Sequence, residues 1–270
     1  MDKNKRISII FILWGVLFIP GVFGQTYDYK ANADRLYERG MSASSYQRTV
    51  PEMAYYEELT FDGRNIFLIY GAHYNPLHIK NMAKVFEQKN IAKNNKQWLF
   101  LIEGITENSV SYSSYAEIEY AAQSAKAWDI AAEDVIPSYA TSRVFQELSQ
   151  KVGSEKAIFF LVMFGMQTGD IIFTEGKGYD EGKIRSTIIQ YIQFCESKKI
   201  PFNIDTLNAL FPINNEKYKK TADECWDIHM EIRNRIASEN FQKILLRYPN
   251  AKNILVYCGR DHAIVFRETK

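Results

Sequence analysis

The chain has 270 residues, of which 46% are hydrophobic and 24% charged, which is the composition of an ordinary folded globular protein. Its 17 Tyr, 17 Phe and 4 Trp exclude a disordered chain, and a total of 14 Gly and 7 Pro excludes a collagen-like or linker-like one. The net charge is +1, and the first 24 residues carry +2 of it, so the rest of the chain carries −1. A near-neutral body without a basic stripe argues against DNA or RNA as a partner.

Residues 1–24 have the pattern of a secretory signal. Basic residues precede the uncharged stretch Ile7–Gly24, which Pro20 and Gly21 interrupt, and small or β-branched residues come before Gln25 as a cleavage site requires. An uncleaved membrane anchor is the alternative, since an apolar run of about 17 residues is near the lower limit for crossing a bilayer. The sequence therefore predicts a secreted or periplasmic protein, or one that contacts the membrane through this segment alone.

The rest of the chain alternates between short apolar runs and helical patterns. Residues 25–59 read as a polar, Tyr-rich N-terminal extension with a helical stretch at Ala31–Arg39, and Asp62-Gly63 is a turn signal. Continuous apolar runs predict strands buried on both faces at Ile66–Tyr70, Trp98–Ile102, Ala157–Phe164 and Ile254–Cys258. Helices are expected at Leu77–Ala92, Tyr115–Trp128, Thr141–Lys151, Lys183–Cys195 and Ala222–Tyr248. This order predicts an α/β domain over residues 60–270, with a mostly parallel central sheet flanked by helices.

Two further features concern the organisation of that domain. The segment 165–220 is rich in glycine in its first part, and we expect it to form a helical or loop insertion over the C-terminal edge of the strands. Three cysteines, Cys195, Cys225 and Cys258, are too few and too scattered for a disulfide framework or a zinc knuckle. Buried free thiols are the expected state, with one incidental bridge as the alternative.

Polar side chains follow three of the expected strands. His73, Glu103 and His262 come just after strands that end near residues 70, 102 and 258, and each has a glycine close by. Because ligands bind beyond the carboxyl ends of parallel strands, we expect these three side chains to meet in one crevice. Two imidazoles and a carboxylate suit zinc, manganese or cobalt with an open position for water. The alternative for each residue taken singly is a hydrogen-bonded structural role.

These motifs, taken in order, resemble the TraB/Tiki superfamily, which includes the erythromycin-esterase and haem-binding ChaN-like proteins. The resemblance covers roughly residues 60–267. It rests on Gly71 with His73, Glu103, Glu119, Arg233 with Asn234 ahead of Ile236-Ala237, and Gly259 with His262. Gly71 and His73 are separated by one residue, where the family's first motif usually has two. Members differ in activity (metal-dependent proteolysis, ester hydrolysis or haem binding), so the resemblance implies an architecture and a site more directly than a substrate.

The candidate site residues have the following expected roles. His73 and His262 are metal ligands, and Glu103 is a third ligand or the base that takes a proton from bound water. Glu119 is a second candidate for the base, unless it lies on a solvated face of its helix. Arg233 has the planar donors that suit a substrate carboxylate or a developing oxyanion, or it pairs with a site glutamate.

Other residues are expected to contact the substrate or to support the site. His229 lies one helical turn before Arg233, although a core-edge or surface position is the alternative. His78 can face the crevice from the start of its helix, and either Arg260 or Asp261 is expected to orient a ligand. The remaining substrate-contact candidates are Asn234 and Tyr74, the latter together with Tyr70, Tyr112 and Tyr115 as possible cleft walls or ordinary packing residues.

We therefore expect an exported metal-dependent hydrolase, a peptidase or esterase, with a small-molecule or peptide substrate. A non-catalytic protein that binds haem or another small ligand on the same scaffold is one alternative. A degenerate family member that has lost the site is another.

Overall fold

The computed structural model describes residues 27–43, 54–72, 75–105, 115–138, 141–167, 173–174, 178–179, 181–211 and 215–267. The expected signal segment, His73, Tyr74 and Tyr112 lie outside these ranges. None of the described helices combines the length and the apolar character that crossing a membrane requires. The three cysteines are buried free thiols.

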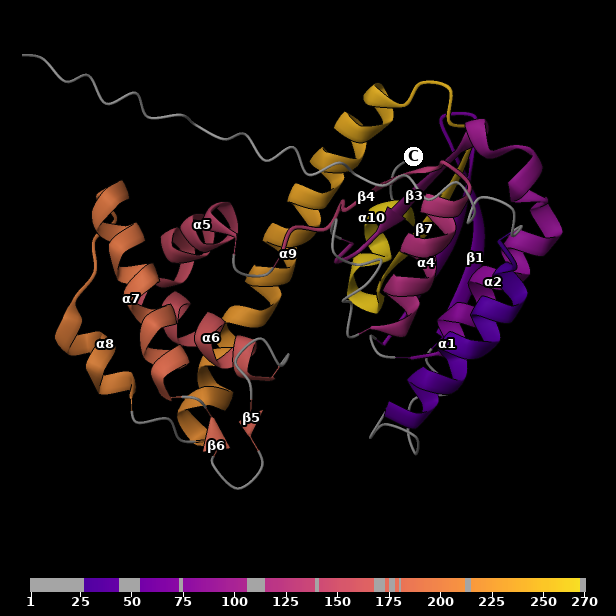
Figure 1. Ribbon diagram of the computed structural model, residues 1–270. Coiled ribbons are helices and arrows are strands. Elements are labelled where there is room, and N and C mark those ends of the chain that lie inside the picture. Colours follow the sequence, from indigo (N-terminus) through magenta and orange to yellow (C-terminus); the bar gives the residue numbers. More distant parts are fainter. Residues whose placement is uncertain are drawn as a thin grey trace, which may run out of the picture.

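A five-stranded sheet forms the centre of the α/β part (Figure 1). The order is β1-β2-β7-β3-β4, and every neighbouring pair is parallel except the antiparallel pair β1 and β2. The strands are β1 Ala54–Phe61, β2 Arg64–Gly71, β3 Trp98–Ile102, β4 Ala131–Glu133 and β7 Asn253–Gly259. The predicted mostly parallel sheet is confirmed, and three of its four expected strands are β2, β3 and β7. The expected boundary at residue 60 falls inside the edge strand β1, most of which lies in the expected N-terminal extension.

Helices cover both faces of the sheet. Successive side chains of β2, β3 and β7 point to opposite faces and enter two hydrophobic clusters, one on each face. One cluster lies under α1 (Tyr29–Ala43), α2 (Leu77–Lys89) and α4 (Ala116–Ala127), and the other under α10 (Ile264–Arg267) and the C-terminal half of α9 (Asn215–Arg247). The side chain of Asn75 accepts a hydrogen bond from the Leu77 backbone N–H at the start of α2. Burial on both faces explains why the strands are continuous apolar runs.

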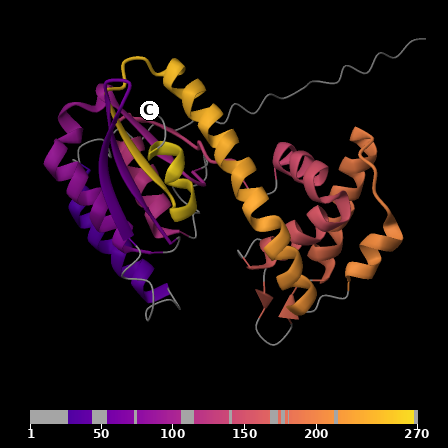
Figure 2. The same ribbon diagram turned by 180° about the vertical axis from the view of Figure 1, so that it is seen from behind.

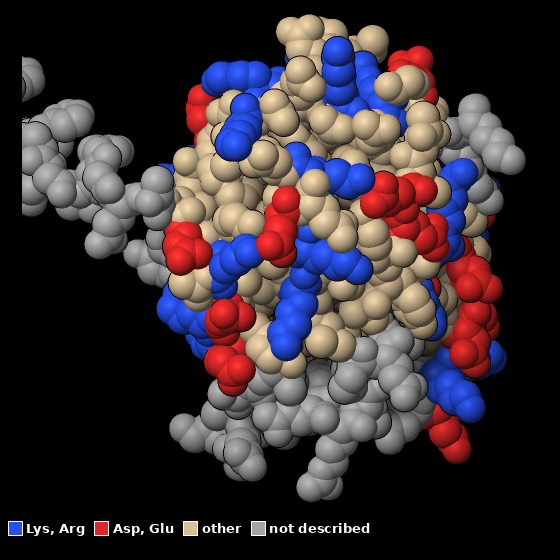
Figure 3. All heavy atoms as spheres, turned by 90° about the vertical axis from the view of Figure 1, so that its right-hand side faces the viewer, with Lys and Arg blue, Asp and Glu red and all other residues tan. Residues whose placement is uncertain are grey.

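Acidic and basic side chains are interspersed on the face seen from the right-hand side of Figure 1 (Figure 3). Lys30 pairs with Glu87 at 2.5 Å and so joins α1 to α2, and Lys89 pairs with Glu58 at 3.2 Å and joins α2 to β1. All four side chains are at least one-third exposed, so these ion pairs contribute little to stability.

A separate group of helices, here called the helical lobe, lies to one side of the sheet (Figures 1 and 2). It contains α5 (Ser142–Val152), α6 (Ser154–Gln167), α7 (Glu181–Lys198), α8 (Ile204–Leu210) and the N-terminal half of α9, packed around a third hydrophobic cluster. The short strands β5 (Phe173–Thr174) and β6 (Gly178–Tyr179) pair with each other. The lobe therefore includes α5 and α6, which precede the expected insertion at 165–220.

The prediction of a strand at Ala157–Phe164 is wrong, because this segment lies inside α6. Residues 157–163 are each at most 7% exposed, since other helices of the lobe surround α6. A helix buried on all sides is apolar on all sides, so its sequence shows the same unbroken run as a buried strand.

The long helix α9 joins the lobe to the sheet. Its 33 residues extend about 50 Å at the usual rise per residue. Cys225, Ile232 and Ile236 pack in the lobe, whereas Phe241 and Ile244 pack against the sheet. One rigid element thus contributes side chains to both cores and to the boundary between them.

Candidate functional site

The ends of β2, β7 and β3 meet at one edge of the sheet, as the sequence analysis predicted. Gly71 pairs with Gly259 in the register of β2 and β7, and Ile102 pairs with Tyr257 in the register of β3 and β7. The Glu103 backbone N–H donates to the Tyr257 carbonyl at 2.9 Å and extends this ladder by one residue. The segments that carry the three candidate ligands therefore leave adjacent strands.

Glu103 is held at the centre of this edge. Its Oε2 accepts a hydrogen bond of 2.7 Å from the Gly259 backbone N–H, and its Oε1 lies 3.2 Å from Arg233 Nη2 and 3.6 Å from His262 Nε2. The chain turns sharply after it at Gly104, whose φ of +78° favours glycine. The carboxylate thus has a guanidinium, an imidazole and a backbone donor around it while only 11% of its side chain is exposed.

Asn234 fixes the orientation of His262. Its Nδ2 donates to the Asp261 carbonyl at 3.0 Å, so its Oδ1 is the atom that lies 2.6 Å from His262 Nδ1. An amide oxygen accepts hydrogen bonds, so Nδ1 carries the proton and, in the neutral imidazole, Nε2 presents a lone pair towards Glu103. Asn234 was expected to contact substrate, whereas these bonds make it a residue that positions the imidazole.

The side chain of Arg233 extends from α9 to Glu103, at the end of β3. Its Nε donates to the Pro137 carbonyl at 3.0 Å, and its Nη2 donates to Glu103. Only 8% of the residue is exposed. The structure therefore has the arrangement in which Arg233 pairs with a site glutamate, one of the two roles that the sequence left open.

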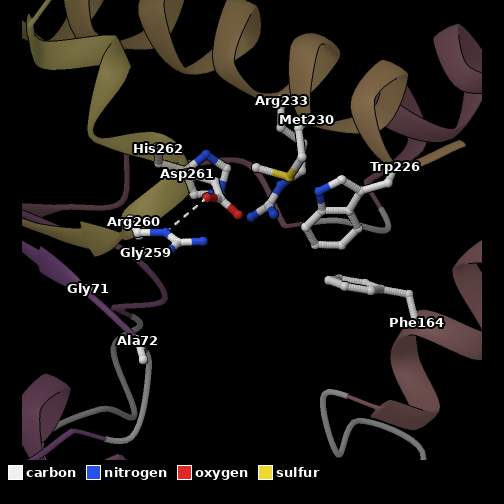
Figure 4. A pocket seen from close by; sticks show the side chains of 10 residues that line it. All are labelled: Gly71, Ala72, Phe164, Trp226, Met230, Arg233, Gly259, Arg260, Asp261 and His262. Carbon is white, nitrogen blue, oxygen red and sulfur yellow. Dashed lines mark ion pairs between the residues drawn. The ribbon is translucent and has the colours of Figure 1, made fainter. Parts of the chain in front are cut away.

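A pocket of about 240 Å³ opens between this edge and the helical lobe (Figure 4). Its polar side holds Arg233, Arg260, Asp261 and His262, and Arg260 pairs with Asp261 at 3.5 Å. The other described residues that line it are Gly71, Ala72 and Gly259 from the strand ends, and Phe164, Trp226 and Met230 from the lobe. His262 and Arg233 thus face a space bounded by both parts of the molecule.

Two of the three expected metal ligands, Glu103 and His262, are described and lie side by side, and metal binding itself stays a prediction. His73 lies outside the described residues, although Ala72 before it lines the pocket. Within the described ranges no group of three or more His, Cys, Asp or Glu side chains is placed to hold a metal ion. His262 Nε2 and Glu103 Oε1 are 3.6 Å apart, so both atoms fit at about 2.1 Å from one ion with an angle of about 120° between them.

The two glutamates of α4, Glu117 and Glu119, are both buried, and neither of the two positions expected for Glu119 is found. Glu119, the candidate base, pairs with Arg39 of α1 at 2.6 Å and accepts a hydrogen bond from Gln123, so it faces α1 and away from Glu103. Glu117 is 1% exposed and accepts a hydrogen bond of 3.1 Å from the Tyr257 hydroxyl. Both are buried because the sheet covers one side of α4 and α1 covers another.

The remaining two histidines support the site from behind. His78 is fully buried, its Nε2 donates to the Ala72 carbonyl at 3.1 Å, and its ring meets Tyr257 edge-on. His229, expected to contact substrate, is fully buried and packs against the rings of Phe160 and Phe164, behind the lobe side of the pocket. His78 therefore anchors the loop that leads to His73, and His229 supports the pocket wall.

Asp134 is a site neighbour that sequence reasoning missed. It follows β4, and its carboxylate accepts hydrogen bonds of 3.0 Å from the Gly104 and Ile136 backbone N–H groups. Loss of hydration, with the nearby Glu103 charge adding to it, raises the pKa of Asp134 to about 7. The same rule that found Glu103 applies to Asp134, but β4 is only three residues long and gave no strand signal.

Tyr70 and Tyr115, two of the expected cleft tyrosines, belong to the hydrophobic clusters on the two faces of the sheet. Among the described residues, the aromatic side chains at the pocket, Phe164 and Trp226, come from the lobe instead.

Comparisons with known proteins return no match: no family model fits the sequence, and no curated protein or solved structure is similar to the chain.

Proposed function

We propose that this protein is an exported metal-dependent hydrolase that acts on an ester or amide carbonyl, as its resemblance to the TraB/Tiki superfamily implies. The observation that carries the proposal is the pair His262 and Glu103, whose facing atoms are 3.6 Å apart at adjacent strand ends and border a pocket. Asn234 holds the imidazole in the tautomer that a ligand or a base requires.

In the proposed reaction, the residues at this edge have different roles. A zinc, manganese or cobalt ion bound by His262, Glu103 and His73 would supply a water molecule of lowered pKa. Glu103 binds the ion or accepts the proton of that water. Arg233 places a buried guanidinium beside the carbonyl under attack and stabilises the negative charge that develops on its oxygen.

The pocket favours a group the size of a single amino-acid side chain over a haem. Its volume of about 240 Å³ is below the range of about 300–1,000 Å³ that is usual for drug-sized ligands. A hydrolase that admits only the group next to the scissile bond is consistent with that size.

Metal analysis tests the proposal. Protein purified without chelator is expected to contain about one divalent ion per chain, and both His262→Ala and Glu103→Gln are expected to lose it. Glu119→Gln is the matched control, because it removes a buried carboxylate that pairs with Arg39 away from the site. Hydrolysis of ester or peptide substrates is expected to return when metal is added to the chelated protein.

Two outcomes contradict the hydrolase. A Soret band on addition of haem, with no bound divalent ion, indicates a binding protein. Absence of bound metal, together with a melting temperature unchanged by divalent cations, indicates a degenerate site, since a ligand that binds only the native state raises that temperature.

A further inference from the structure

The lobe side of the pocket is an apolar wall, defined here as Phe164, Trp226 and Met230. Trp226 and Met230 are four residues apart on α9, so they share one face of the helix, and Arg233 follows three residues later on that face. The ring of Phe164, from α6, lies 5.4 Å from that of Trp226 at an interplanar angle of 59°. Figure 4 shows the three side chains opposite the strand ends, next to Arg233.

The apolar wall is supported from behind. His229 is fully buried, and its ring centroid lies 5.8 Å from Phe164 and 6.5 Å from Trp226. Phe160 packs against both His229, at 5.2 Å, and Phe164, at 6.0 Å between ring centroids. The wall therefore rests on the packed core of the lobe, to which Phe160 belongs, while Trp226 lines the pocket and remains 36% exposed.

The residues opposite the wall have small side chains or none, and the cations that line the pocket are paired with carboxylates. Gly71, Ala72 and Gly259 contribute no bulky side chain. The cations that line the pocket each have a carboxylate nearby, since Arg233 pairs with Glu103 and Arg260 pairs with Asp261. A slot with an aromatic wall on one side, backbone on the other and balanced charge suits a neutral, flat or bulky apolar group.

We propose that the apolar wall is a specificity subsite for a neutral aromatic or bulky aliphatic group carried on the acyl side of the scissile carbonyl. This inference rests on the proposed hydrolase function, because Arg233 and His262 mark where the carbonyl lies. The preferred substrates are thus esters or amides of acyl groups such as aromatic or large aliphatic amino acids, and small or charged acyl groups are poor substrates.

Two methyl esters test the inference with the metal-loaded full-length protein. N-acetylphenylalanine methyl ester and N-acetylglycine methyl ester differ only in the benzyl group, and hydrolysis of either consumes one water and releases methanol and an acid, whose proton a pH-stat records. We expect kcat/KM to be at least about tenfold higher for the phenylalanine ester. In Trp226→Ala the ratio of the two values is expected to fall several-fold, whereas Leu246→Ala, an exposed residue of the same helix, leaves it unchanged.

A binding measurement separates failure of the subsite from failure of the proposed function. N-acetylphenylalaninamide is titrated into the same three proteins and followed by NMR. Saturable binding that Trp226→Ala weakens and Leu246→Ala does not supports the subsite even if neither ester is hydrolysed. Equal kcat/KM for the two esters, a ratio that Trp226→Ala leaves unchanged, or, where neither ester is hydrolysed, absence of binding overturns it.

Discussion

Replacing Glu103 by Gln removes one negative charge from the centre of the strand edge while keeping an oxygen that can accept the Gly259 N–H. Arg233 then stays charged and only 8% exposed, with the Pro137 carbonyl still bonded to its Nε. Removing one partner of a buried ion pair typically costs about 3–5 kcal/mol. Because the Pro137 carbonyl partly compensates the Arg233 charge, we expect the free energy of unfolding to fall by about 3 kcal/mol. This corresponds to a fall of about 6–12 °C in melting temperature for a chain of this size.

The reciprocal change, Arg233→Met, keeps the length of the side chain and leaves Glu103 as the uncompensated charge. We expect a similar loss of stability from it. The double variant Glu103→Gln/Arg233→Met has neither charge, so its loss of unfolding free energy is expected to be clearly smaller than the sum of the two single losses.

Urea denaturation followed by circular dichroism measures these free energies, with a chelator present so that metal binding does not contribute. Glu119→Gln serves as a comparison, because its Arg39 partner is 44% exposed and loses little when the pair is broken. Additive losses in the double variant, or a loss below about 1 kcal/mol in Glu103→Gln, would refute a buried, coupled pair at this edge.

Three further predictions address the surroundings of the site. Asn234→Ala is expected to weaken metal binding about 10–100-fold by releasing His262, with little effect on the melting temperature of the metal-free protein; competition with a chelating dye measures it. Gly104→Ala is expected to cost about 1–2 kcal/mol in denaturation experiments because φ is +78°, and a neutral result would contradict that backbone geometry. The Arg267 guanidinium lowers the pKa of Glu57, so the stability advantage of wild type over Arg267→Leu is expected to be present at pH 7 and to shrink as pH falls below the ordinary value of 4.5; an advantage equal at pH 7 and pH 3 would argue against the pair.

The sheet was predictable where burial is complete. β2, β3 and β7 are apolar without interruption because helices cover both of their faces, and this is the pattern that identified them. β1 is a half-exposed edge strand that carries Glu57 and Glu58, and β4 has three residues, so neither produced that pattern. α6 produced it for a different reason, because it is a helix enclosed by other helices.

The site was predictable to the extent that strand ends define it. Glu103 and His262 follow adjacent strands, so the topology alone brings them together. Glu119 was a poor choice because a helix covered on two sides buries several of its faces, and sequence does not tell which one meets the sheet. The apolar wall at Phe164 and Trp226 depends on how the lobe packs beside the sheet, which no local pattern encodes.

The place of β7 has a consequence for how the molecule is made. It is the last of the described strands to leave the ribosome, yet it lies between β2 and β3, which have no direct pairing with each other. Until it emerges, the nascent sheet is two separate halves and neither Glu103 nor Arg233 has His262 beside it. Loss of the chain from residue 253 onward would therefore remove the central strand of the sheet together with His262, so we expect a truncated product to be unable to fold and to lack one of the candidate ligands.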